Sequence, residues 1–141
     1  ILDFLAGGET LPDMTNAEKA HMYEVRRVVR AVQFLFFFLF LMSLVLFIFL
    51  YRVHRKKFLS SFLFFAGLNT IILQLILGII LIFFSYFFDI FHRIFFKGVW
   101  AFPAGDLLVT LYPYGFFRDT LFIVFLINLL IGGILLKCPR I

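Results

Sequence analysis

Cysteine, nucleophile motifs and intramembrane charge are all scarce in this sequence. The single cysteine, Cys138, excludes a disulfide within the chain and gives no metal-ligand spacing. There is no G-x-S-x-G motif and no glycine-rich phosphate loop, so neither a serine nucleophile nor a phosphate-binding site is indicated. The interiors of the three apolar runs carry no ionisable group, which argues against a transporter or channel because ion paths normally contain such groups.

Apolar residues are abundant instead. They make up 64% of the 141 residues, including 24 Phe, whereas soluble domains are about half apolar. We therefore predict an all-α fold: a polytopic membrane helix bundle with three transmembrane helices in this chain. The chain is expected to divide into three regions: an extracytoplasmic segment at 1–15, the membrane helix bundle at 16–136 and a cytoplasmic tail at 137–141.

The first transmembrane helix has a clear start signal. Thr15 and Glu18 have the spacing of a capping box, so a helix is predicted from there to Tyr51. About 35 residues at 1.5 Å each span roughly 52 Å, which exceeds a hydrocarbon core of about 30 Å. The spanning part is therefore predicted at Ala31–Tyr51, with the first four turns outside the lipid. The segment before Thr15 holds Gly and Pro and is predicted to be extended and polar.

The second and third spans follow a short basic turn, Arg52–Lys57. The second span is predicted at 62–87 and the third at 121–136. The third span starts nearer Phe116 if the aromatic pair Phe116–Phe117 is included. Asn69 and Gln74 interrupt the second span. We expect both side chains to face a neighbouring helix, because polar groups facing acyl chains are costly.

Residues 88–119 are predicted to form an aromatic-rich interfacial loop. Its start has a helical apolar stripe, and glycine and proline residues then break the helix, leaving one helical turn at 106–111. The loop also carries aromatic side chains of the kind that anchor backbone at a lipid–water boundary: Trp100, Tyr112 and Tyr114.

Basic residues without neighbouring acids indicate the orientation. All eight acidic residues fall on the side of the N-terminus and the interfacial loop. The other side carries six basic residues in the short turn and the tail, which predicts that this side is cytoplasmic. The N-terminus and both His21 and His92 are thus expected outside the cytoplasm. An odd number of spans in that orientation fits a further helix preceding Ile1.

This topology brings two histidines to one membrane face. His21 lies before the first span and His92 follows the second. Imidazole titrates near pH 6.5, so the two rings can form an acid/base pair. Two other interpretations remain open: both rings are simply solvated interfacial groups, or they bind zinc with Glu18 or Glu24. Clustered ligand spacing is absent, so no metal site is predicted.

Two motifs in order carry a family resemblance. One is Glu18-Lys-Ala-His21-Met22, and the other is Phe88-Asp-Ile-Phe-His92-Arg-Ile-Phe-Phe96 followed by Trp100. The combination resembles the bacterial lipoprotein intramolecular transacylase (Lit) family over about residues 10–136. One departure is Glu24, where the family pattern usually has Asp.

The resemblance implies a four-helix membrane enzyme, of which this chain lacks the first helix and much of the outer segment after it. Members move the sn-2 acyl chain of a diacylglyceryl lipoprotein onto the α-amino group of its N-terminal cysteine, which gives the lyso-form. The family's two functional histidines would fall on His21 and His92, working without a cofactor at the extracytoplasmic face of the bacterial cytoplasmic membrane. The implied partners are the lipoprotein substrate and membrane lipid, with no nucleic acid; the oligomeric state is not indicated.

Within that chemistry, His92 is assigned as general base and His21 as the partner that donates to the leaving glyceryl oxygen, and the reverse order stays open because the sequence does not distinguish the two rings. Other residues are predicted to bind substrate or support the site: Glu18, Glu24, Arg26, Arg93, Trp100 and Asp106. The competing interpretation is a non-catalytic membrane scaffold or accessory subunit that docks through the aromatic loop. It would tolerate substitution of both histidines.

Overall fold

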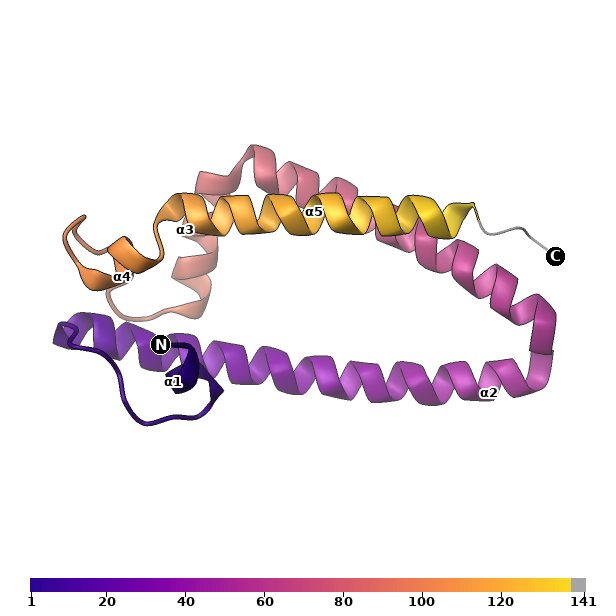
Figure 1. The fold of residues 1–141 in the computed structure, drawn as a ribbon, viewed down its shortest axis with the longest axis horizontal. Helices are drawn as coiled ribbons and strands as arrows, with labels where there is room; N and C mark the ends of the chain where they lie inside the picture. The colour runs from indigo at the N-terminus through magenta and orange to yellow at the C-terminus, as the bar shows by residue number, and fades with distance from the viewer. Residues whose placement is uncertain (138–141) are drawn as a thin grey trace. The chain divides into compact units, whose positions relative to one another are not determined.

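Every regular element in the described part of the chain is an α-helix. The computed structural model describes residues 1–137, except for the side chains of residues 54–57. The elements are α1 (Leu2–Ala6), α2 (Asn16–Ile82), α3 (Phe84–Phe95), α4 (Leu107–Leu111) and α5 (Tyr114–Leu136) (Figure 1). Three stretches are long and apolar enough to cross a membrane: Asn16–Val53, Phe58–Ile82 and Leu107–Leu136. The predicted all-α fold with three membrane helices is confirmed.

The capping box at the start of α2 forms as predicted. The Thr15 backbone N–H donates to Glu18 Oε2 over 2.8 Å, and the Glu18 backbone N–H donates to the Thr15 hydroxyl over 3.3 Å. These reciprocal bonds satisfy two donors that the first turn of a helix leaves unpaired. Helix α2 accordingly begins at Asn16.

The segment before α2 is not extended throughout, so that prediction is wrong for Leu2–Ala6. These residues form α1, and the Phe4 side chain is 0% exposed. The Phe4 ring meets Tyr23 edge-on at 5.1 Å, and it joins Met14, Met22 and Leu108 in a buried apolar cluster. Burial of a phenylalanine favours an ordered segment here, since it removes a large apolar surface from water.

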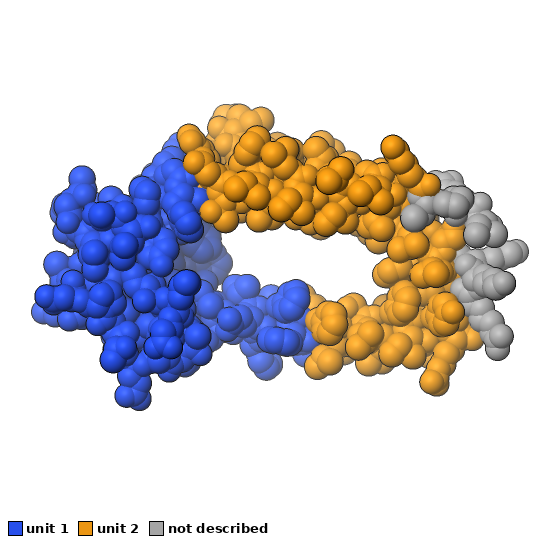
Figure 2. Space-filling model, in the orientation of Figure 1, with its two compact units in different colours: residues 1–38, 85–117 blue, residues 39–84, 118–141 orange. Residues whose placement is uncertain are grey.

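The chain divides into two compact units, coloured separately in Figure 2. Unit 1 contains residues 1–38 and 85–117, and unit 2 contains residues 39–84 and 118–141. Within unit 2, the Phe47 ring lies 5.0 Å from the Phe62 ring. Fifteen residues of straight helix would separate them by roughly 22 Å, so the chain reverses between them. The side chains of the predicted basic turn at His54, Arg55, Lys56 and Lys57 lie outside the described residues.

Small residues allow the second span and α5 to pack closely. A Cβ atom added at Gly67 would lie 3.0 Å from the Gly132 carbonyl oxygen. Buried Gln74 lies seven residues, about two turns, after Gly67 and therefore shares its helix face, as predicted. The prediction that Asn69 faces a neighbouring helix is wrong, because its side chain is exposed. Asn69 follows Gly67 by two residues, which places it about 200° around the helix from the face of Gly67.

Substitution of Gly67 is expected to destabilise unit 2. The Gly67→Ala methyl group would press on backbone atoms of α5, which cannot rotate away, and we expect a loss of about 1–3 kcal/mol in unfolding free energy. Gly133→Ala is the matched control, because nothing lies within 4 Å of its added Cβ atom. Thermal unfolding of both purified variants in detergent measures the difference. Equal melting temperatures would contradict close packing at Gly67.

The interfacial segment matches prediction in part. Helix α3 covers the predicted apolar stripe, and α4 starts after Asp106 as expected. Two boundaries differ. Helix α2 ends at Ile82, five residues before the predicted end of the second span, and α5 begins at Tyr114. Residues 114–119 are thus helical; Pro113 directly precedes this helix, a position where the missing N–H costs no helical bond.

Candidate active site

His21 and His92 lie together in unit 1. His21 projects from α2 and His92 from α3, and their ring centroids are 6.1 Å apart with planes inclined by 16°. Each side chain is only 9% exposed. The sequence placed both residues at one membrane face; the structure adds that the rings stack and are removed from water.

Aromatic rings enclose the two imidazoles. Phe96 contacts both, with centroids 4.7 Å from His21 and 5.1 Å from His92. Phe102 lies 5.4 Å from His21, and Trp100 lies 5.1 Å from His92. These rings lower the local polarity and restrict water, which strengthens any hydrogen bond made by the imidazoles.

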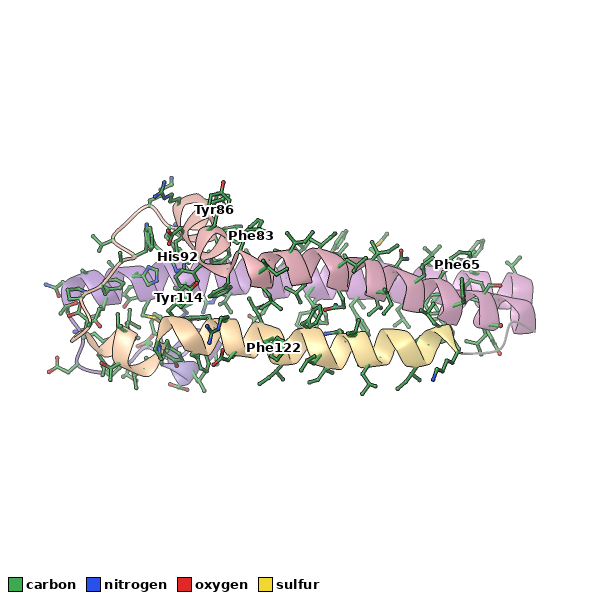
Figure 3. All side chains as sticks on the ribbon, turned by 90° about the horizontal axis from the view of Figure 1, so that it is seen from above. Phe65, Phe83, Tyr86, His92, Tyr114 and Phe122 are labelled. Carbon is green, nitrogen blue, oxygen red and sulfur yellow. The ribbon has the colours of Figure 1, made fainter. Side chains whose placement is uncertain are left out.

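The backbone of α3 fixes the proton position on His92. Its Nδ1 lies 2.8 Å from the Phe88 carbonyl oxygen, one helical turn earlier. A carbonyl oxygen can only accept, so Nδ1 carries the proton and donates it. The neutral ring therefore has its lone pair on Nε2, the atom that can take a proton from a substrate. His92 and Tyr114, labelled in Figure 3, both contact the Phe88 ring, at 4.2 and 5.3 Å between centroids.

His21 lacks such an anchor. Its Nδ1 is buried and has no hydrogen-bond partner among the described residues. His21 belongs to residues 16–30, which precede the predicted spanning part of α2. Up to Val53, α2 has 38 residues and is roughly 57 Å long, which is longer than a hydrocarbon core. Burial, and secondarily the nearby His92, lower the pKa of His21 from its usual value, while the Glu24 carboxylate opposes this shift. The lowered pKa favours the neutral form of the His21 ring.

Glu18 and Glu24 do not contact the imidazoles through hydrogen bonds but hold backbone groups. Glu18 is 1% exposed, and its Oε1 accepts from the Leu108 N–H over 2.8 Å. This bond is the main cause that lowers the pKa of Glu18, so the carboxylate is ionised at neutral pH. Glu24 accepts longer bonds of 3.4 Å from the N–H groups of Lys97 and Gly98.

The other predicted supporting residues are spread out. Arg26 donates to the Gly8 carbonyl oxygen over 3.1 Å, and its guanidinium carbon lies 4.6 Å from the Phe4 ring centroid. It thus holds the N-terminal segment. Arg93 is exposed, and Asp106 precedes α4 without a side-chain cap bond. Of the six supporting residues predicted, Trp100 packs its ring against a histidine ring, and Glu24 interacts electrostatically with His21.

Sequence reasoning missed the aromatic partners Phe96 and Phe102 as parts of the site. It also missed the role of the Phe88 carbonyl group, although the Phe88–His92 spacing of four residues was a usable signal. Among the described residues, no group of three or more His, Cys, Asp or Glu side chains could hold a metal ion.

The sequence around this site matches a known family. The family profile described as "Lipoprotein intramolecular transacylase Lit" matches residues 9–117, more than three quarters of the chain and including both histidines. The chain belongs to the Lit family. No curated protein and no solved structure matches it. Membership of the Lit family implies an acyltransferase that performs intramolecular lipoprotein transacylation, with a lipoprotein as substrate.

The resemblance found in the sequence motifs is thereby confirmed. Together with the three candidate spans, it makes this Lit protein a multi-pass membrane enzyme. The family also favours the enzyme over the scaffold interpretation of the aromatic loop.

Proposed function

We propose that this Lit protein moves the sn-2 acyl chain of a diacylglyceryl lipoprotein to the α-amino group of its N-terminal cysteine, with His92 as general base and His21 as hydrogen-bond donor. The observation that carries the proposal is the buried, stacked pair of imidazole rings within the family-matched residues. The product is the lyso-form lipoprotein.

The reaction requires orientation and one proton transfer. The amine and the ester belong to the same substrate, so the protein has only to hold them in a reactive geometry. The amine has a reference pKa of about 7.7–8.0, and its neutral fraction attacks the ester carbonyl. A C–N bond forms and the ester C–O bond breaks. The nitrogen loses one proton and the glyceryl oxygen gains one, so the reaction consumes neither water nor a co-reactant.

His92 suits the proton transfer. Its Nδ1–H is committed to the Phe88 carbonyl oxygen, which leaves Nε2 as the base. In this proposal Nε2 takes the proton from the attacking nitrogen and returns it to the glyceryl oxygen as that oxygen leaves. The protonated form of His92 is the acid in the second half of the reaction, so one residue both takes the proton and returns it.

On the sequence alone, His21 is assigned to proton donation to the leaving glyceryl oxygen. The structure favours hydrogen-bond donation by this ring instead. Its lowered pKa favours the neutral ring, and a neutral imidazole is a poor source of a full proton. A neutral imidazole still donates one N–H hydrogen bond, and here that bond would go to the carbonyl oxygen as negative charge develops on it. Enclosure by Phe96 and Phe102 would strengthen this bond.

The membrane placement is part of the proposal. The first turns of α2 would stand above the hydrocarbon core, with the histidine pair near the headgroups on the extracytoplasmic face. Residues 1–15 would lie on that same face, and residues 137–141 would form a cytoplasmic tail. The basic residues without acidic neighbours support this orientation.

A synthetic diacylglyceryl lipopeptide tests the proposed reaction. Purified protein is expected to convert it into an isomer of unchanged mass whose fragmentation shows an N-acyl chain and a free glyceryl hydroxyl group. The same lipopeptide with an acetylated α-amine lacks the attacking nitrogen and is expected to remain intact. Tandem mass spectrometry distinguishes the isomers. Release of free fatty acid from either peptide, without an N-acyl product, would indicate hydrolysis and contradict the proposal.

A further inference from the structure

We infer that Glu18 and Glu24 are positioning residues: their carboxylates hold the two ends of the loop at 97–108 against the histidine pair and take no proton in the reaction. The inference rests on the proposed function of His21 and His92. It concerns how these rings are kept in place.

The two carboxylates lie on either side of His21 along α2. Glu18 precedes it by three residues and Glu24 follows it by three, so each is a neighbour of His21 on the helix surface. A loop held by both glutamates can therefore pass over His21. The structure shows this arrangement in the ring contact between His21 and Phe102, which lies between the two anchors.

Each carboxylate holds one end of the loop. Glu18 Oε1 accepts from the Leu108 N–H at the start of α4, across 90 residues of sequence. Glu24 accepts from the N–H groups of Lys97 and Gly98, just after α3. The Glu18 bond is short and buried, while the Glu24 bonds are long, so Glu18 is the stronger anchor.

The loop between the anchors carries two of the rings that enclose the imidazoles. Trp100 lies against His92 and Phe102 lies against His21, so a shift of the loop changes the surroundings of both rings. Misplacement of a reacting group by about 1 Å costs about 10²-fold in rate. The two carboxylates therefore affect the reaction rate through the position of the loop, although neither forms a hydrogen bond with an imidazole.

The hydrogen bonds leave Glu18 poorly suited to proton transfer. Its Oε1 is used by Leu108, and its Oε2 accepts from both the backbone N–H and the hydroxyl of Thr15. Glu18 is 1% exposed, so it presents almost no accessible surface to a substrate. Both Glu24 oxygens likewise face backbone donors. A carboxylate with these partners stabilises the loop by accepting hydrogen bonds, and its amide analogue retains one acceptor oxygen.

Paired substitutions separate positioning from catalysis. Glu18→Leu and Glu24→Leu remove the acceptors and are expected to lower kcat, by about 10²-fold for Glu18→Leu and by less for Glu24→Leu. Glu18→Gln and Glu24→Gln keep an acceptor oxygen but cannot exchange a proton at neutral pH, and they are expected to recover most of the lost rate. Glu9→Leu is the matched control, because Glu9 is an exposed glutamate in the same unit.

Trp100 supplies a readout that does not depend on activity. It is the only tryptophan in the chain, and its ring centroid lies 5.1 Å from that of His92. Release of the loop would expose this half-buried indole to water, which shifts its emission to longer wavelength. We expect the wild-type emission maximum in Glu18→Gln and Glu9→Leu and a red-shifted maximum in Glu18→Leu.

The two readouts give distinct outcomes. A normal rate and an unshifted emission maximum in Glu18→Leu, or a Glu18→Gln variant as slow as Glu18→Leu, would overturn the inference. The second result would instead indicate a proton-carrying carboxylate. If His21 and His92 variants stay active while the emission of Glu18→Leu is red-shifted, the loop anchoring stands and the proposed catalytic role of the histidines fails.

Discussion

Purified His92→Asn protein is expected to lose transacylase activity by about 10²–10⁴-fold, the usual contribution of a positioned general base. The asparagine amide can still donate to the Phe88 carbonyl oxygen from the position of Nδ1, so the local contact with α3 is preserved. What it lacks is the Nε2 lone pair. The loss should therefore appear in kcat, with little change in KM.

The His92→Asn measurement needs a matched control on the same helix. Ile94→Asn introduces the same side chain at a position that is 68% exposed, and it is expected to keep the wild-type rate. Lyso-lipopeptide formation is followed by mass spectrometry at equal amounts of folded protein. A His92→Asn protein as active as Ile94→Asn would remove the base from the proposed mechanism.

Substitution of His21 by Phe is expected to cost about 10²–10³-fold in kcat, the range for loss of one hydrogen-bond donor to a developing oxyanion. Phenylalanine preserves a ring that can pack against Phe96 and Phe102, so the loss would report the missing N–H and not a collapsed site. His21→Gln offers an amide N–H of similar reach and is expected to recover part of the rate.

The result for His21 also separates the two candidate roles of this ring. If His21 donated a full proton, neutral Gln could not replace it, and both variants would be equally slow. If it donates a hydrogen bond, Gln is faster than Phe. If both His21→Phe and His21→Gln react as fast as the wild-type protein, His21 takes no part in the reaction.

Local and periodic features of the fold could be predicted from the sequence. The start of α2 follows from the Thr15 and Glu18 spacing, and the spans follow from apolar length. The common location of His21 and His92 followed from counting membrane crossings. Each of these features depends on residues near one another in sequence or on the thickness of the bilayer.

Features that depend on distant contacts could not be predicted. Glu18 reads as a capping residue, and nothing nearby indicates that its other oxygen binds Leu108, 90 residues away. The short helix α1 was also missed, since its stability comes from burial of Phe4 against Tyr23 and Arg26. Five residues without a side-chain cap do not form a stable helix by local propensity alone.

The measurement that bears most directly on the central claim is the rate of the double variant His21→Phe, His92→Asn compared with both single variants. Loss of a general base leaves the rate that oxyanion stabilisation and substrate binding supply. Because the two rings are proposed to act on different atoms of one transition state, we predict that the double variant is slower than either single variant. Single variants that each retain near wild-type rates, or a double variant as fast as the slower single variant, would contradict a histidine site with these two roles.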